Sequence, residues 1–163
     1  MKIINVGYRS VNCYLIISKN SKLLVGVGWP GGMQELKWNL AAKSLSVKDV
    51  THVLITHYHM DHGAIAQEMK DKDAKLIVME SQIEHLNDQK KFIKPPMAFH
   101  EIKNEGNIEL AVKSSRVFLK MLEIDGEIIS TQGHSTDHVS LILDQGIAFT
   151  GDFTYREWLA RRI

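Results

Sequence analysis

A cluster of three histidines and one aspartate constrains this sequence more than any other feature. The segment at residues 56–63 reads THYHMDHG and places His57, His59, Asp61 and His62 within six positions. It directly follows residues 50–55, whose β-branched character predicts a strand. Imidazole nitrogens and carboxylate oxygens bind zinc, iron and manganese. The segment therefore predicts a metal site at the carboxyl end of a strand, where α/β proteins often place their sites.

The composition is that of a small globular protein. Its 163 residues are 44% hydrophobic, so we expect one core and a single domain over residues 1–163. Lys and Arg number 20 against 19 Asp and Glu, which disfavours nucleic acid or a membrane as partner. Positive charge gathers at Arg156, Arg161 and Arg162, interpreted as a solvated helix face. Cys13 is the single cysteine and is expected to be a packed thiol. One cysteine and no evident export signal predict a cytoplasmic protein.

Strands and helices are expected to alternate along the chain, which is typical of the α/β class. Pro95 and Pro96 interrupt this alternation, and residues 94–107 are expected to form a loop over a pocket. Helices are predicted at residues 33–45, 63–70, 81–91 and 114–122. Strands are predicted at residues 2–6, 11–17, 22–27, 50–55, 75–79, 98–102, 127–130, 139–143 and 147–150.

Two later segments repeat the order strand, glycine and ligand. Gly133 precedes His134, and Gly151 precedes Asp152. A glycine lets the backbone turn sharply before the side chain that follows it. His134 and Asp152 are therefore further candidate ligands. His138, four residues after His134, is expected to support a ligand rather than to bind an ion.

The spacing of the candidate ligands suits two adjacent ions. A mononuclear catalytic zinc usually has three protein ligands, so His57 and His59 need a third, for which His134 is the candidate. Asp61 and His62 lie farther along the turn and suit a second ion. Asp152 is a candidate to bridge the two positions.

These motifs, in this order and spacing, resemble those of the metallo-β-lactamase fold superfamily. The resemblance rests on residues 56–63, on Gly133-His134-Ser135 and on Thr150-Gly151-Asp152, and residues 11–15 are similar to the first hairpin of that family. It implies an αββα sandwich. It also implies that His57, His59 and His134 hold the first metal, and that Asp61, His62 and Asp152 hold the second.

Two departures from the family pattern stand out. Gly26 occupies a position where the family commonly carries an aspartate, and such outer hydrogen bonds orient metal ligands. Family members also normally continue past Asp152 to a further histidine. The resemblance therefore implies an incomplete second half and unequal affinities for the two ions. It also implies an exposed strand edge or apolar surface that a second copy of the chain would cover in a homodimer.

The implied function is metal-dependent hydrolysis of a small ester, thioester or related substrate, similar to that of glyoxalase II-like hydrolases. One or two zinc ions, or else iron or manganese, would generate a bound hydroxide near neutral pH. Asp61 would hold the water and pass on its proton. Two alternatives remain open. One is a mononuclear iron dioxygenase acting on persulfides, which needs three histidines alone, and the other is a truncated, non-catalytic metal-binding domain.

Overall fold

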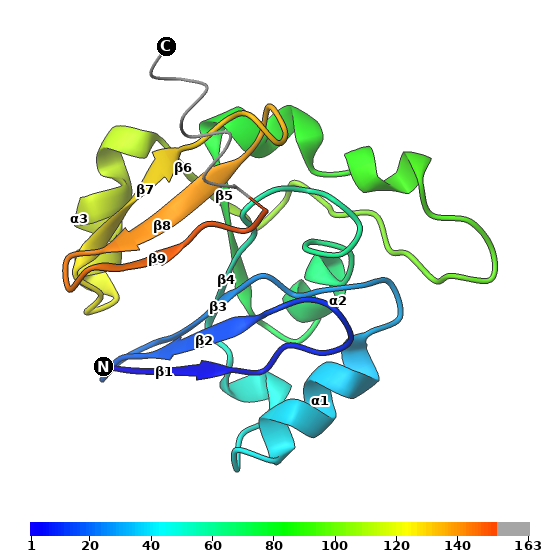
Figure 1. Cartoon of the computed structure of the whole chain (residues 1–163), viewed down its shortest axis with the longest axis horizontal. Helices are drawn as coiled ribbons and strands as arrows, with labels where there is room; N and C mark the ends of the chain where they lie inside the picture. The colour runs from blue at the N-terminus through cyan, green and yellow to red at the C-terminus, as the bar shows by residue number, and fades with distance from the viewer. Residues whose placement is uncertain (153–163) are drawn as a thin grey trace.

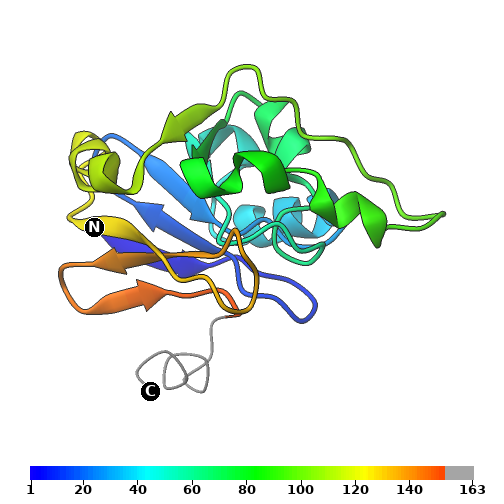
Figure 2. The same cartoon turned by 90° about the horizontal axis from the view of Figure 1, so that it is seen from above.

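The computed structural model describes residues 1–152, which form two β-sheets with helices packed around them (Figures 1 and 2). Arg156, Arg161 and Arg162 lie outside the described residues. Within residues 1–152, no helix has the length and apolar character needed to cross a bilayer. The arrangement is the mixed α/β fold that the sequence predicts.

The larger sheet contains, in this spatial order, β1 (Lys2–Asn5), β2 (Tyr14–Ile17), β3 (Lys22–Val25), β4 (His52–Leu54), β5 (Lys75–Met79) and β6 (Ile108–Leu110). The first three strands pair antiparallel, and β3 to β6 pair parallel. Because β3, β4 and β5 run in the same direction, their carboxyl ends meet at one edge of the sheet. That edge carries the candidate metal site.

Two helices cover one face of this sheet: α1 (Met33–Ala41) and α2 (Ala66–Lys70). Met33, Leu36 and Leu40 of α1 recur at helical spacing and are buried against the sheet. Ala66 and Met69 of α2 join the same core. Short 3₁₀ helices connect the remaining elements: η1 (Val47–Asp49), η2 (Glu80–His85), η3 (Asp88–Lys91) and η4 (Val112–Ser114).

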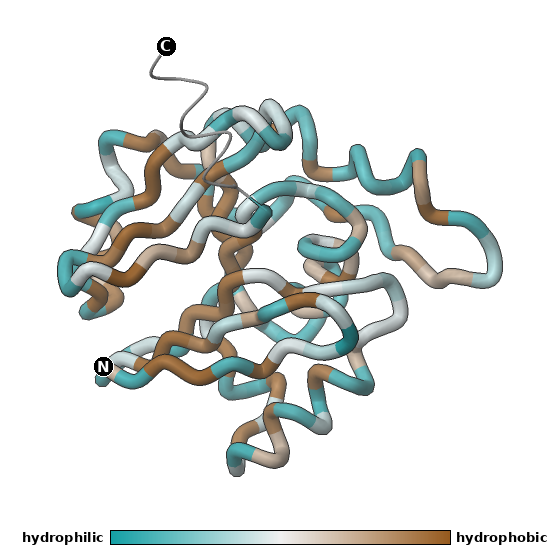
Figure 3. Tube along the Cα trace, in the orientation of Figure 1, coloured by the Kyte–Doolittle hydropathy of each residue, from teal (hydrophilic) through white to brown (hydrophobic). Residues whose placement is uncertain are grey.

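The smaller sheet is an antiparallel meander of β7 (Gly126–Ser130), β8 (Val139–Leu143) and β9 (Ile147–Phe149). Helix α3 (Ser115–Met121) lies against β7, where the Ser115 hydroxyl accepts a hydrogen bond from the Ile128 N–H (3.0 Å). The two sheets share a second apolar core, and Figure 3 shows how apolar residues follow the strands of both. This core contains Leu23, Leu54 and Ile77 of the larger sheet and Ile128, Val139 and Leu141 of the smaller one.

The strands predicted at residues 75–79 and 139–143 are confirmed at both ends. Two predictions in the middle of the chain are wrong. Residues 81–91 form η2 and η3 instead of one α-helix, and residues 98–102 are not a strand. The Asn87 side chain explains part of this difference, because it donates to the Ile102 carbonyl (3.1 Å) and accepts from the Ile102 N–H (2.8 Å). The backbone of Ile102 is thus satisfied without a neighbouring strand. The sequence reasoning also missed β6.

Candidate metal centre

The loop after β4 carries four of the six predicted ligands and is fastened to the sheet by backbone hydrogen bonds. The Gly26 N–H donates to the Leu54 carbonyl (2.9 Å) at the end of β4. The N–H groups of Val27 and Gly28 both donate to the His62 carbonyl, at 2.8 and 3.2 Å. The continuation of β3 therefore holds the ligand loop in place. Because β4 lies between two parallel neighbours, its apolar residues are buried and its polar continuation emerges at the edge.

Three imidazoles converge in a first cluster formed by His57, His59 and His134. One nitrogen atom of each lies within 4.8 Å of the others, and His134 Nε2 is 3.0 Å from His59 Nδ1. The His57 side chain is fully buried, with its Nδ1 3.2 Å from the Thr56 hydroxyl. Its Nε2 has no hydrogen-bond partner among residues 1–152. A buried imidazole nitrogen without a partner, facing two others, is the arrangement that a divalent ion satisfies. The donor set therefore suits a metal.

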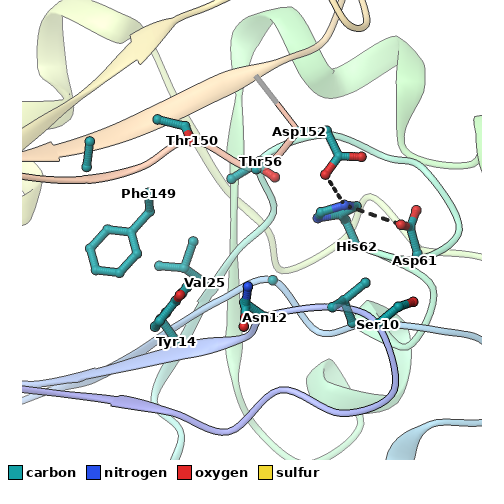
Figure 4. Close-up of a pocket in the computed structure, with 14 residues that line it drawn as sticks. Ser10, Asn12, Tyr14, Val25, Thr56, Asp61, His62, Phe149, Thr150 and Asp152 are labelled. Atoms are coloured by element: carbon teal, nitrogen blue, oxygen red, sulfur yellow. Dashed lines mark ion pairs between the residues drawn. The ribbon is translucent and has the colours of Figure 1, made fainter. Parts of the chain in front are cut away.

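A second cluster adjoins the first and shares His57 with it. His57, His62 and Asp152 place one ligand atom each within 4.8 Å of the others. His62 Nε2 lies 3.1 Å from Asp152 Oδ1 and 3.5 Å from Asp61 Oδ2, as the dashed lines of Figure 4 indicate. The other Asp152 oxygen lies 3.6 Å from His134 Nε2 and 4.0 Å from His57 Nε2. Asp152 thus reaches both clusters, and the structure brings all six predicted ligands together.

Residues just before β8 attach the second sheet to the ligand loop. The buried carboxylate of Asp137 accepts a hydrogen bond from the Tyr58 N–H (2.7 Å), between the two candidate ligands His57 and His59. The Val139 N–H donates to the Thr56 carbonyl (2.8 Å). The sequence reasoning missed Asp137. Its position in the same turn as His134 is the signal that was present, but its partner lies 79 residues away in the chain.

His138, which the sequence predicts to support a ligand, packs against His57 with ring centroids 4.9 Å apart. Its Nδ1 lies 2.9 Å from the Thr131 hydroxyl. Burial, and then the neighbouring His134, lower the pKa of His138 to about 4. Burial also lowers the pKa of His57, and the surrounding imidazoles lower it further. Both side chains are therefore neutral at pH 7, and neutral imidazole is the form that binds metals.

A cavity of about 290 Å³ opens beside the second cluster (Figure 4). Asp61, His62 and Asp152 form one part of its wall. The first hairpin, formed by β1 and β2, supplies Asn12 and Tyr14, and the end of β3 supplies Val25. Phe149 and Thr150 lie at the end of β9. The cavity therefore gives access to the second cluster from between the two sheets.

Gly26 lines the same cavity in a left-handed backbone conformation with φ +74°. A Cβ atom there would meet the Asn12 carbonyl oxygen at 3.5 Å, an ordinary contact. The position thus has room for a Cβ atom, at the cost of backbone strain.

Comparisons with known proteins agree with this geometry. A family model of the metallo-beta-lactamase superfamily matches residues 6–161. The curated hydroxyacylglutathione hydrolase of Nitrobacter winogradskyi is 30% identical over 105 residues, which are 63% of this chain and 33% of that protein. The chain therefore spans about a third of the curated relative.

Solved structures show the same fold. A subclass B3 metallo-beta-lactamase of Bradyrhizobium japonicum is 22% identical with a TM-score of 0.67, over 86% of this chain and 53% of that one. A metallo-beta-lactamase from Novosphingobium pentaromativorans is 17% identical with a TM-score of 0.70, over 90% and 55%. The chain spans about half the length of these proteins. Because the family model covers nearly the whole sequence, this chain belongs to the metallo-β-lactamase superfamily.

Proposed function

We propose that this protein is a zinc-dependent hydrolase of small ester or thioester substrates. Asp152 carries the proposal, because its two carboxylate oxygens face different clusters, at 3.1 Å from His62 Nε2 and 3.6 Å from His134 Nε2. A carboxylate in that position could serve as a ligand in either cluster. One ion would be held by His57, His59 and His134, and a second by Asp61, His62 and Asp152.

The side chains around the clusters supply the remaining requirements of hydrolysis. When bound here, a divalent ion would lower the pKa of water from about 15.7 to roughly 7 and polarise the oxygen under attack. Asp61 lines the cavity, and its Oδ2 lies 3.5 Å from His62 Nε2. From this position the carboxylate accepts the proton of the attacking water and returns it to the leaving group.

The substrate class is supported by the comparisons and by the cavity. The curated relative is named for the hydrolysis of hydroxyacylglutathione, an acyl group carried by a small molecule. The cavity beside the second cluster is of a size that suits a small acyl compound rather than a polymer.

Metal content and turnover test the proposal together. We expect the purified chain to bind up to two zinc ions, counted by mass spectrometry, and to hydrolyse a simple thioester. A chelator should abolish the activity and added zinc should restore it. One iron per chain, with oxygen consumption in the presence of a persulfide, would instead favour the dioxygenase. Bound metal without turnover of any ester, thioester or persulfide would contradict both enzymatic functions.

A further inference from the structure

Three amide groups of the first hairpin form a chain of hydrogen bonds with a fixed direction. The Gly7 N–H donates to Asn5 Oδ1 (2.8 Å), and Asn5 Nδ2 donates to Asn12 Oδ1 (2.7 Å). A backbone N–H can only donate, so Asn5 must present its side-chain oxygen to Gly7 and its side-chain NH2 group to Asn12. Asn12 consequently uses its oxygen as the acceptor. The NH2 group of the Asn12 side chain must therefore point away from Asn5.

The side-chain NH2 group of Asn12 points into the cavity. Figure 4 shows its nitrogen directed towards the space below Thr56 and His62, and Asn12 is one of the residues that line the cavity. Within residues 1–152, no group accepts a hydrogen bond from this NH2 group. Both asparagines are exposed, and the hydrogen bond between them directs this donor towards the cavity beside the candidate metal clusters, where it can bind an oxygen atom of a ligand.

The rest of the wall selects against a charged ligand. The ring centroids of Tyr14 and Phe149 lie 5.3 Å apart, and the two rings form an apolar part of the wall together with Val25. None of the lining residues that the structure describes is Lys or Arg. The carboxylates of the lining, Asp61 and Asp152, both lie beside His62. Within residues 1–152, a carboxylate on the far part of a ligand would therefore meet no Lys or Arg of the cavity lining.

We propose that Asn12 binds the carbonyl oxygen, or another uncharged oxygen, of a neutral acyl substrate whose acyl chain rests on Tyr14, Val25 and Phe149. The inference deepens the proposed hydrolase function and rests on it. Asn12 touches the substrate, whereas Asn5 acts through Asn12 and is a positioning residue. A neutral hydrogen bond of this kind corresponds to about a 3- to 10-fold change in affinity.

A matched pair of thioesters tests the substrate class. S-butyryl-N-acetylcysteamine is neutral, whereas S-succinyl-N-acetylcysteamine has an acyl chain of the same length that ends in a carboxylate. We expect the zinc-loaded protein to have a kcat/KM for the butyryl compound about 10-fold or more above that for the succinyl compound. An equal or higher kcat/KM for the succinyl compound would overturn the substrate class.

Variants of the amide chain test the role of Asn12. Asn12→Ala removes the donor. Asn5→Asp still accepts from Gly7 but cannot donate to Asn12, so the Asn12 amide should turn its oxygen to the cavity. Both variants should raise KM for the butyryl thioester about 3- to 10-fold at unchanged zinc content. In the Asn12→Ala background, Asn5→Asp should cause no further rise in KM. A general loss of structure would instead raise KM further. Asn104→Asp, an exposed change outside the cavity lining, is the matched control.

A binding measurement separates this inference from the hydrolase proposal. N-(2-acetamidoethyl)butanamide replaces the thioester sulfur by an N–H and is not readily cleaved. We expect calorimetry to show that it binds the wild-type protein about 3- to 10-fold more tightly than either variant, even if no thioester is hydrolysed. That result would support the role of Asn12 while contradicting the hydrolase. Equal affinity for wild type and Asn12→Ala, or no binding to the wild type, would overturn the inference.

Discussion

Burial decides the chemistry of single residues in this protein. The His57 ring is fully buried among four other imidazoles, and its lowered pKa keeps it neutral. Asp61 and Asp152 retain partial exposure, so both stay close to solvent and to the cavity. The candidate site therefore combines a buried, neutral imidazole inside with carboxylates at the rim.

Asp61 offers a direct test of proton transfer. Asp61→Asn keeps the size of the side chain but cannot accept a proton at neutral pH. We expect kcat to fall by about 10²- to 10⁴-fold, while the zinc held by the three histidines remains. Kinetics with zinc quantification check this, and Asp144→Asn, whose carboxylate pairs with Arg116 on the surface, is the control. Full activity in Asp61→Asn would refute the assignment.

Gly26 tests whether a supporting carboxylate is missing. Gly26→Asp and Gly26→Ala share the strain of a side chain at φ +74°, which costs about 1–2 kcal/mol, but only the first adds a carboxylate to the cavity wall. Hydrogen bonds outside the ligand shell are worth about 10- to 100-fold in metal affinity. We expect zinc titration to show tighter binding in Gly26→Asp than in Gly26→Ala. Equal affinities would mean that the site functions without this group.

Cys13 provides a test of burial that is independent of metal. Burial raises the pKa of the Cys13 thiol to about 12, and the residue is 1% exposed. The protonated thiol thus stabilises the fold fully below the unfolded pKa of about 8.5, and this contribution is lost as the pH rises towards 12. We expect a disulfide reagent at pH 8 to label Cys13 in urea but not in the native protein. Rapid native labelling would show that the core opens easily.

At the scale of elements, the predictable parts are those whose residues determine their own structure. Runs of buried apolar residues define β5 and β8, and the spacing of Met33, Leu36 and Leu40 defines α1. Strand β6 could not be recognised, because it has three residues and none is fully buried. The region of η2 and η3 depends on side chains that bind distant backbone groups. Gln82, for example, donates to the Ile55 carbonyl (2.9 Å) beneath the ligand loop.

The same distinction holds for the candidate site. The six candidate ligands could be named from the sequence because a local motif, or a glycine at the end of a strand, marks each of them. Asp137 was not recognisable, since its role depends on the Tyr58 N–H, which approaches it only when the two sheets pack together.

Asp137 therefore yields a prediction about how the elements are joined. Asp137→Ala leaves the buried Tyr58 N–H without an acceptor, which costs about 1–3 kcal/mol. Because Tyr58 lies between His57 and His59, we expect lower stability in urea and weaker zinc binding. Asp137→Asn keeps an oxygen acceptor and should lose much less. If both variants lose zinc affinity equally, the charge of Asp137 matters rather than its hydrogen bond.

At the scale of the whole molecule, the metal centre lies where the two sheets meet. His57, His59, Asp61 and His62 lie in the loop that follows β4 of the larger sheet. His134 lies between β7 and β8 of the smaller sheet, and Asp152 follows β9. A bound ion would therefore connect the two sheets, and its binding energy would add to the stability of their packing.

Thermal unfolding with and without zinc tests this connection. A ligand present at about 1,000 times its dissociation constant stabilises the native state by about 4 kcal/mol. We expect zinc to raise the Tm of the wild-type chain by several degrees and a chelator to reverse the change. In His134→Ala, which removes a ligand of the smaller sheet, most of this increase should disappear. An equal zinc effect in both proteins would mean that the larger sheet binds the ion alone.

The first hairpin has a further consequence for how such a protein can diversify. It contributes Asn12 and Tyr14 to the cavity wall but none of the six candidate ligands. The proposed substrate contacts of the hairpin and the candidate ligands thus occupy separate stretches of sequence. Mutations in the hairpin can accumulate under selection for a new compound while the ion-binding residues remain under constraint. Exchanging this hairpin between relatives is therefore a direct route to engineered preferences.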